Sequence, residues 1–177
     1  MSKLKIRTYP DPILKKKAKE IDKVDDETGD LVTEMKRLMR EGDGVGLAGP
    51  QAGVSKRIFI IDASDGKGVR VFINPKICKK KGKQVGEEGC LSLPGLEVEI
   101  KRAKSLECEF LDNKGKEQKL KVSDLLATII QHEIDHLDGK LLVDKVGWFK
   151  RYKLLKEYEG LKKSKEGEQN VLEKMIG

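Results

Sequence analysis

Apolar residues recur at helical spacing near the start of the chain. In residues 31–39 they fall on one stripe, at i, i+1, i+4, i+7 and i+8, and Gly42 is a natural end for that helix. Further upstream, residues 10–20 pass from a proline-containing turn into a run of lysines, which indicates a short basic helix. We therefore expect two helices in the N-terminal part of the chain.

Two more helical segments lie in the C-terminal half. The first begins at Ser123, a favourable N-cap residue, and runs to about residue 137, with Gly139 just past its end. The second covers residues 148–161, where apolar residues alternate at helical spacing with lysine and arginine. This second pattern predicts an amphipathic C-terminal helix.

Between these helical segments the hydrophobic period changes to that of β-strands. Short β-branched runs, or runs that alternate apolar and charged residues, are separated by glycine and asparagine turns. The expected strands cover residues 57–61, 69–73, 96–101, 106–111 and 117–122. Such alternation is typical of antiparallel sheets with one face in water. The pattern predicts an α+β fold, with antiparallel strands packed around a central helix at residues 123–137, N-terminal helices and a C-terminal helix.

Composition narrows the class of protein. The chain has 177 residues, 37% hydrophobic and 38% charged, with 37 Lys+Arg against 30 Asp+Glu and a net charge of +7. This length favours a single domain over residues 1–177, of which residues 147–177 form a basic helix or tail. No apolar stretch approaches the ~18–20 residues of a membrane span, and none follows the positive N-terminus as in a secretion signal. We expect a cytoplasmic protein with no membrane partner.

The only two histidines of the chain lie four residues apart on the predicted central helix. Residues at i and i+4 share one helix face, so His132 and His136 can direct both imidazoles at one ion. Glu133 lies about 100° around the helix from His132, where it can reach a metal-bound water without being a ligand. The alternative is a pair of core histidines hydrogen-bonded to the backbone. Because two inward imidazoles on an apolar helix are costly without partners for their nitrogens, we favour a metal site.

A third protein ligand is expected, because catalytic zinc-type sites usually have three. The chain has three cysteines at irregular spacing, which is not a disulfide framework, and by default each is a buried thiol. Cys90 is favoured as the ligand because glycine and a chain reversal flank it. Cys78 lies in a lysine run and Cys108 in an alternating strand, and periodicity alone excludes neither of them, nor the many carboxylates.

Three segments together resemble the three signature motifs of the peptide deformylase family. They are GVGLAGPQ at residues 44–51, EGCLS at residues 88–92 and QHEIDH at residues 131–136, in the order and at the separations of that family. Residues 9–12 and 17–18 also resemble its N-terminal segment. Three motifs in register are much more specific than any one of them.

This resemblance extends from about residue 4 to residue 145 and has two departures. Gly49 stands where the family commonly has a second alanine, a small change that we expect to loosen the loop. Residues 145–149 leave the common pattern, so nothing about the tail follows from the resemblance.

The resemblance implies a metal-dependent hydrolase with one divalent ion per chain, bound by Cys90, His132 and His136. A thiolate with two imidazoles suits zinc, iron(II), cobalt or nickel, and the family is known for using iron(II) in the cell. The fourth position would hold water, which the cation converts to a hydroxide that attacks the formyl carbon. Glu133 would take the proton as general base and later pass it to the leaving amine.

The resemblance also implies which groups stabilise the negative charge that develops on oxygen. Beside the metal, these are the side-chain amide of Gln51 and the backbone N–H of Leu91. Taken alone, Gln51 would be interpreted as a surface glutamine after a loop. Only the match to the family gives it a catalytic role.

The implied reaction is removal of the N-formyl group from the N-terminal formylmethionine of newly made proteins, with release of formate. An extended nascent peptide would lie between the backbones of Val45 and Gly46 on one side and Gly89 on the other. Ile129, on the histidine face, is our candidate for lining the methionine pocket. Without the resemblance, residues 44–51 would be a turn between helix and strand, since they lack both the Walker ending and the dinucleotide spacing.

Positive charge is concentrated at the end of the chain. Residues 147–165 contain seven Lys or Arg and two Glu, a net charge of +5, and a second lysine run covers residues 76–83. Such runs are commonly solvated faces. The more specific interpretation is an electrostatic footprint for RNA, and since the family acts on nascent chains, contact with the ribosome through the C-terminal segment is our hypothesis.

Two other functions compete with deformylation. An endopeptidase uses a similar helical motif, but usually finds its third ligand after the helix, whereas Cys90 lies 42 residues before His132. A ribosome- or RNA-binding module with a purely structural metal is the second alternative. The presence of Glu133 and Gln51 argues against it, because a structural site requires neither of them.

Overall fold

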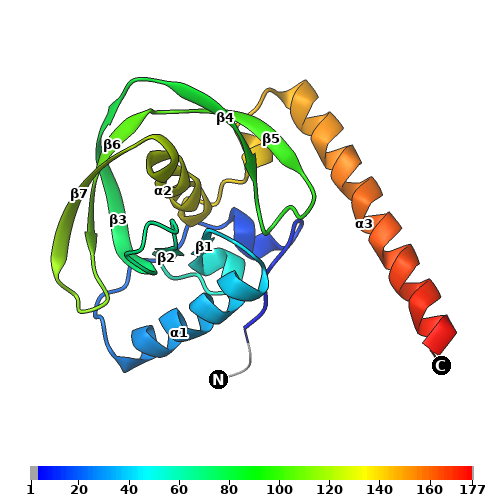
Figure 1. The fold of residues 1–177 in the computed structure, drawn as a ribbon, viewed down its shortest axis with the longest axis horizontal. Coiled ribbons are helices and arrows are strands. Elements are labelled where there is room, and N and C mark those ends of the chain that lie inside the picture. Colours follow the sequence, from blue (N-terminus) through cyan, green and yellow to red (C-terminus); the bar gives the residue numbers. More distant parts are fainter. Residues whose placement is uncertain (1–3, 177) are drawn as a thin grey trace.

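The computed structural model describes residues 4–176, with side chains as far as residue 164. The fold is α+β, as predicted, and its strands curve around one central helix, α2 (Figure 1). A five-stranded antiparallel sheet has the order β1-β2-β3-β6-β7, and β4 and β5 form a two-stranded sheet. The strands are β1 (Gly46–Ala48), β2 (Ile58–Ile61), β3 (Arg70–Lys81), β4 (Gln84–Gly89), β5 (Glu97–Arg102), β6 (Ser105–Leu111) and β7 (Glu117–Ser123).

The first long helix, α1 (Asp26–Glu41), confirms the stripe seen in the sequence and ends at Gly42 as expected. It begins before the stripe does, because the Asp25 side chain caps it by accepting a hydrogen bond from the Thr28 N–H at 3.1 Å. Its buried face packs against β2 and β1, so the helix lies next to the glycine-rich segment that contains β1.

The predicted basic helix at residues 10–20 is wrong beyond its first turn. Only the 3-10 helix η1 (Pro12–Lys15) forms. The chain after it is extended, because the Lys19 N–H donates to the Ser55 carbonyl and the Lys19 carbonyl accepts from the Arg57 N–H. These hydrogen bonds to a distant segment replace the local ones that a helix would need.

The central helix α2 (Asp124–Leu137) is confirmed within one residue at its start. Ser123 occupies the N-cap position, but its hydroxyl hydrogen-bonds the Asp124 carboxylate instead of capping a backbone N–H. One arc of the helix, including Ala127 and Ile130, packs on the stacked rings of Phe59 and Phe72 in the sheet. Because this arc of α2 is packed against the sheet, the orientation of the helix is fixed, and with it the direction in which its histidines point.

Two strands in glycine-containing segments were not expected from the sequence. β1 lies within the glycine-rich loop, with Leu47 opposite Ile60 of β2, and β4 pairs with β5, with Glu88 opposite Val98. Both have weak intrinsic strand propensity, since they are rich in glycine. They are strands because a neighbouring strand pairs with them, and each lies at the edge of its sheet.

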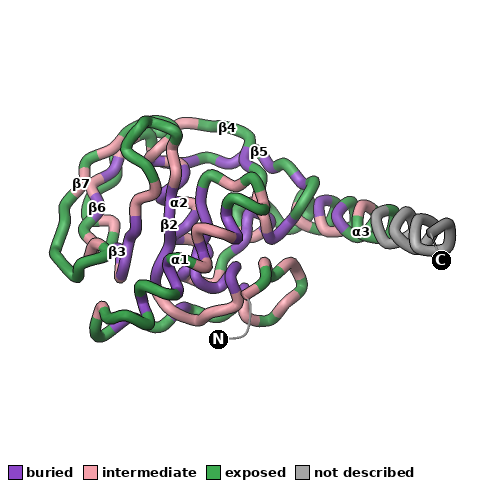
Figure 2. The backbone as a smooth tube through the Cα atoms, turned by 60° about the horizontal axis from the view of Figure 1, so that its bottom comes forward, coloured by how far each residue is buried: buried purple, intermediate pink, exposed green. Residues whose placement is uncertain are grey.

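The predicted C-terminal helix is confirmed as α3 (Trp148–Ile176), which follows the 3-10 helix η3 (Leu142–Asp144). Figure 2 shows α3 leaving the body of the molecule, and among its residues whose burial is described, 148–164, the buried ones are Leu154 and Tyr158. Leu154 and Tyr158 pack into the cluster that contains Leu93 and Leu96. No described helix is both long and apolar enough to cross a membrane.

Candidate metal centre and cleft

One cysteine and both histidines converge where β4 ends against α2. Cys90 directly follows β4, while His132 and His136 lie on successive turns of α2, on the same face of the helix. The Cys90 Sγ lies 3.2 Å from the His136 Nε2, which lies 3.1 Å from the His132 Nε2. One ligand atom from each of the three lies within 4.8 Å of the others. The structure therefore brings together the three side chains that the sequence suggested as ligands, in a group that could hold one metal ion.

These donor atoms suit a single transition-metal ion. Tetrahedral ligands at about 2.0–2.3 Å from an ion lie roughly 3.3–3.6 Å apart. The Cys90–His136 and His136–His132 separations of 3.2 and 3.1 Å are close to this range. Thiolate and imidazole are the donors that such ions prefer over Mg²⁺ or Ca²⁺. Cys78 is exposed, and Cys108 is a core thiol whose pKa burial raises to about 11. The structure thus brings only Cys90, of the three cysteines, to the histidines.

Charge at the centre favours the ligating form of Cys90. Burial alone would raise the pKa of the thiol, but the neighbouring His136 and hydrogen bonds from both imidazoles hold it well below its usual value. Burial likewise opposes charge on His132, yet hydrogen bonds with Cys90 and Glu88 raise the pKa of this imidazole well above its usual value. A thiolate beside two imidazoles is a strong cation-binding group.

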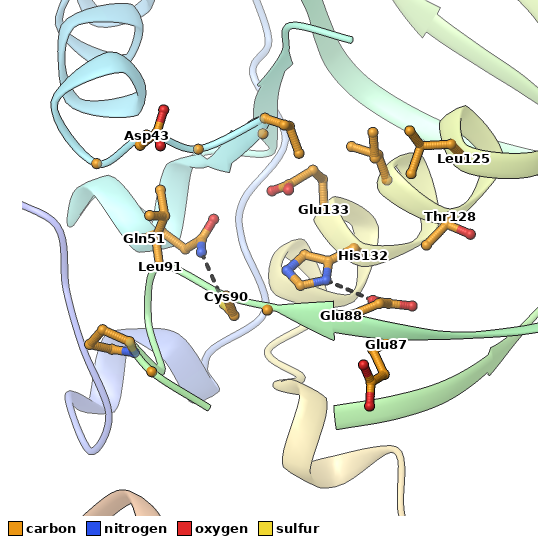
Figure 3. Close-up of a pocket in the computed structure, with 18 residues that line it drawn as sticks. Asp43, Gln51, Glu87, Glu88, Cys90, Leu91, Leu125, Thr128, His132 and Glu133 are labelled. Atoms are coloured by element: carbon orange, nitrogen blue, oxygen red, sulfur yellow. Dashed lines mark hydrogen bonds and ion pairs between the residues drawn. The ribbon is translucent and has the colours of Figure 1, made fainter. Parts of the chain in front are cut away.

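A buried carboxylate orients one of the imidazoles. Glu88 accepts a hydrogen bond from His132 Nδ1 at 2.9 Å (Figure 3). Since a carboxylate only accepts, Nδ1 carries a proton, and Nε2 is the ring nitrogen that faces the centre and can ligate an ion. Burial would raise the pKa of Glu88, but hydrogen bonds from Arg102 and His132 outweigh it and bring that pKa to about 2. Glu88 is therefore an anion under all ordinary conditions.

Arg102 holds this carboxylate in place. Its Nε and Nη2 donate to the two oxygens of Glu88 at 2.8 and 2.9 Å, and its Nη1 donates to Asp135. Lys145 adds a contact to the other oxygen of Asp135 at 3.2 Å. Arg102 is 6% exposed, so this is a buried charge network that extends from β5 to α2.

Sequence reasoning did not assign Glu88, Arg102 or Asp135 a role. A signal existed in the alternation of β5, where Val98 and Ile100 point inward and the next inward position is Arg102. A buried arginine requires acidic partners. Three carboxylates were available within the quoted motifs, at Glu88, Glu133 and Asp135, but which of them lie near Arg102 depends on the packing of β5 against β4 and α2.

Glu133 lies at the back of the cleft with an unsatisfied oxygen. It is 3% exposed, and within the described residues its Oε2 has no hydrogen-bond partner. Burial raises the pKa of its carboxyl group. A Cβ built on Gly46 would lie 3.0 Å from the Glu133 Cδ, so only glycine leaves room for this side chain. Such an arrangement suits a group that exchanges protons with a molecule in the cleft.

Gln51 is buried, and the surface position that its local sequence suggests is wrong. Its Oε1 accepts from the Ala48 N–H at 2.9 Å, which directs its Nε2 to within 3.5 Å of the Cys90 Sγ. The expected loosening at Gly49 stays a prediction, but an alanine here would not be a small change. Gly49 is buried, and a Cβ there would lie 2.5 Å from the Lys56 carbonyl oxygen and 3.0 Å from that of Val54.

The centre opens into a cleft of about 500 Å³ between two sheet edges (Figure 3). β1 and the residues before it form one wall, β4 forms the other, and α2 forms the floor. The residues predicted to bind substrate all line it: Val45, Gly46, Gly89 and Ile129. Leu91 anchors the first wall, since its side chain lies within about 3 Å of where a Cβ on Gly42 would stand. Leu125 also lines the cleft and is 69% exposed.

Known proteins share both the sequence and this arrangement. The family model described as polypeptide deformylase matches residues 3–152. The chain is 50% identical over 139 residues to peptide deformylase 1 of Clostridium perfringens, covering 78% of this chain and 95% of that protein. The chain belongs to the peptide deformylase family. It is 42% identical to the peptide deformylase of Thermodesulfovibrio yellowstonii, covering 90% of this chain and 98% of that one.

Solved structures of peptide deformylases have the same fold. That from Legionella pneumophila has a TM-score of 0.87 at 39% identity and covers 92% of this chain and 96% of its own. That from Synechococcus elongatus, solved in complex with actinonin, has a TM-score of 0.83 at 36% identity, covering 87% and 86%. The chain is therefore an enzyme of a metal-dependent family that acts on formylated nascent peptides.

Proposed function

We propose that this peptide deformylase family member hydrolyses the N-formyl group of N-terminal formylmethionine on new proteins and releases formate. The observation that carries the proposal is Glu133, a buried carboxyl group with a free oxygen in the cleft beside three convergent metal-binding side chains. An amide hydrolase needs a proton-transferring group next to its electrophilic centre.

Cys90, His132 and His136 hold one divalent ion per chain, which we propose to be Fe²⁺ in the cell, with Zn²⁺, Ni²⁺ or Co²⁺ as substitutes. The donor set supports this choice, because one thiolate and two imidazoles suit all four ions. When bound, the cation supplies a Lewis acid that acidifies water and polarises the formyl oxygen. Glu88 supports the site by accepting from the Nδ1 of His132, which orients the ring with its Nε2 towards the ion.

Glu133 moves the protons of the reaction. Its Oε2 takes a proton from the attacking water and later delivers it to the nitrogen of the leaving amine. Burial raises the pKa of this carboxyl group towards the pH at which it must both accept and donate. The contact with Gly46 holds the side chain against the cleft, so little reorganisation is needed when substrate binds.

Gln51 and Leu91 stabilise the charge that develops on the formyl oxygen. The Gln51 Nε2 is a donor already oriented towards the centre by the Ala48 N–H. The backbone N–H of Leu91, next to Cys90, is the second donor. Removal of one preorganised donor of this kind costs on the order of 10²–10³ in rate.

The substrate binds as an extended strand between β1 and β4. Both are edge strands, so each has backbone groups available for a peptide in the cleft. Val45 and Gly46 bind it from one side and Gly89 from the other. Ile129, 6% exposed on the floor, lines the space for an unbranched methionine side chain.

We also propose that α3 contacts ribosomal RNA and that the enzyme works in the cytoplasm. Lysines 150, 153, 156, 162 and 163 are all exposed on this helix. Removing α3 would uncover the core around Leu154 and Tyr158, so charge reversal is the better test. Lys153→Glu with Lys156→Glu and Lys162→Glu should abolish co-sedimentation with ribosomes at low salt, where electrostatic binding is strongest. Unchanged co-sedimentation would contradict the contact.

The decisive experiment measures formate release from formyl-Met-Ala-Ser with protein purified without oxygen. Wild type should release formate, whereas the Glu133→Ala variant and metal-stripped protein should not. No formate from wild type with one metal per chain would overturn the proposal. Cleavage of an internal peptide bond instead would identify an endopeptidase. Absence of both activities would favour an RNA-binding module with a structural metal.

A further inference from the structure

The helix α3 reaches the metal centre from outside the cleft. Among its residues whose burial is described, all except Leu154 and Tyr158 are exposed or half-buried. Tyr158 is 3% exposed and packs in the same cluster as Leu93, with Cys90 against that cluster. The described residues that line the cleft do not include Tyr158, so the ring does not touch the substrate proposed above. Its burial beside a metal-binding residue has no function so far.

We propose that Tyr158 is a positioning residue for the metal centre and that it acts through the backbone of residues 7–9, which we call the N-terminal strap. The strap holds the segments of Cys90 and Gln51 in place relative to each other, and the Tyr158 ring clamps the strap. This inference rests on the proposed function, because it takes Cys90 as a metal ligand. It makes metal retention and turnover depend on a side chain outside the cleft.

The N-terminal strap is hydrogen-bonded to both segments of the site. The Arg7 N–H donates to the Gln51 carbonyl at 2.7 Å. The Tyr9 N–H donates to the Ser92 carbonyl at 2.9 Å, in the turn that follows β4. The strap is therefore a backbone bridge between the segment of the proposed oxyanion donor and the segment of the metal ligand Cys90.

The connection continues from Ser92 to the sulfur of Cys90. The Ser92 N–H donates to the Cys90 Sγ at 3.4 Å, and the Leu93 N–H donates to the Cys90 carbonyl at 2.9 Å. Groups that hydrogen-bond a metal ligand orient it and tune its affinity. Because metal–ligand distances vary by only about 0.2 Å, a shift of this turn would be felt directly by a bound ion.

Tyr158 clamps Tyr9 on the side away from Ser92. The two rings contact edge to face, with centroids 6.1 Å apart and planes at 72°, and such aromatic pairs have a preferred geometry. The Tyr158 hydroxyl also donates to the Tyr9 carbonyl at 3.5 Å. Burial raises the pKa of Tyr158, so this hydroxyl keeps its proton. Tyr9 is thus held through its ring and its carbonyl by α3, and through its N–H by the turn of Cys90.

The alternative is that Tyr158 only stabilises the fold, as any buried ring of α3 would. Leu154, one turn earlier, allows the two roles to be separated. It is buried in the same cluster, but its aliphatic side chain can form neither an aromatic pair nor a hydrogen bond with the strap. Loss of Leu154 should therefore weaken the attachment of α3 without releasing Tyr9.

The test examines the metal centre of the full-length protein loaded with Co²⁺, whose thiolate-to-metal absorption band reports the bond to Cys90. The variants are Tyr158→Leu, which keeps apolar bulk but removes the ring, Tyr158→Phe and Leu154→Ala. Tyr152→Leu is the matched control, because Tyr152 is a tyrosine of the same helix that is 54% exposed. The readouts are the absorption band, the rate of metal loss to a chelator, urea unfolding, and kcat and KM for formyl-Met-Ala-Ser.

Tyr158→Leu should shift the band and lose metal about 10-fold faster than wild type, as expected when a group supporting a ligand is removed. Its kcat should fall while KM stays nearly constant, because Tyr158 does not line the cleft. Tyr158→Phe keeps the ring contact and should restore both metal readouts. Leu154→Ala should unfold at lower urea with the wild-type band and rate of metal loss, and Tyr152→Leu should match wild type throughout.

An unchanged band and rate of metal loss in Tyr158→Leu would overturn the positioning role. Equal changes of the metal readouts in Leu154→Ala, or no recovery in Tyr158→Phe, would overturn it as well. None of these results would affect the proposed function, which formate release by wild type upholds. Wild type that binds Co²⁺ without a thiolate band, or that releases no formate, would overturn the proposed function itself.

Discussion

Glu133 and Gly46 are in direct contact across the back of the cleft. The Cα of Gly46 faces the Glu133 side chain so closely that a Cβ would stand 3.0 Å from the Glu133 Cδ and nearer still to its Oε1. The carboxyl group is buried and cannot simply swing into solvent. The glycine-rich segment therefore has a steric function at this position in addition to any backbone contact with substrate.

This contact predicts that Gly46→Ala displaces the proton-transferring group without disturbing the metal ligands. We expect kcat for formate release to fall by at least about 10²-fold, the usual contribution of a positioned general base. The metal content should stay near one per chain. Gly29→Ala is the control, because nothing lies within 4 Å of its added Cβ. Near the N-terminal end of α1 it should raise stability by up to about 1 kcal/mol and leave turnover unchanged. Equal turnover of Gly46→Ala and wild type would refute the steric role.

Because Arg102 neutralises Glu88, which in turn orients His132, we predict that replacing Arg102 lowers both the stability of the fold and its affinity for metal. Arg102→Met would leave Glu88 and Asp135 buried without their main counter-charge, which costs about 3–5 kcal/mol in unfolding free energy. Because Glu88 would lose its orientation, metal affinity should also fall by about 10–100-fold. Urea unfolding of the apo-protein and competition with a chelator measure the two effects. Lys119→Met, which breaks an exposed pair with Glu109, should leave stability close to that of wild type.

The ion pair between Asp144 and Arg151 of α3 predicts that acid weakens the attachment of this helix. Burial would raise the pKa of Asp144, but Lys15, the Leu141 N–H and Arg151 outweigh it and lower that pKa below its usual 3.8. A lowered pKa in the folded state stabilises the protein above the unfolded-state value, and this contribution is lost as the pH falls through the folded-state value. Asp144→Asn should therefore be less stable than wild type at neutral pH, and the difference should shrink below about pH 4. A difference in unfolding free energy that is constant down to pH 3 would contradict this account.

The close packing around Gly49 predicts that alanine at this position lowers both stability and turnover. In Gly49→Ala, the added methyl group would meet the carbonyl oxygens of Lys56 and Val54, both of which are backbone atoms. Overpacking of this kind costs about 1–3 kcal/mol. Because Gly49 begins the turn that carries Gln51, kcat should fall as well. Thermal unfolding and formate release test both effects, and a variant as stable as wild type would show that the segment 54–56 can move aside.

The sequence by itself determined the elements whose signals are local. The stripe before Gly42 predicted α1, the run after Ser123 predicted α2, and the alternating runs predicted five strands, because helical and strand periods are visible within about ten residues. The spacing of His132 and His136 likewise required only a helix. For these features the neighbouring residues contain all the information.

The tertiary structure decided everything that joins distant segments. β1 and β4 are strands only through their partners, and residues 16–20 are extended because they bind residues 55–57. Cys90 rather than Cys78 or Cys108 reaches the histidines because β4 ends against α2. Gln51 is buried beside Cys90, and Arg102 meets Glu88 and Asp135, because segments that are distant in the sequence pack together. Burial and hydrogen bonding between segments outweigh local propensity, and one-dimensional spacing does not record which segments meet.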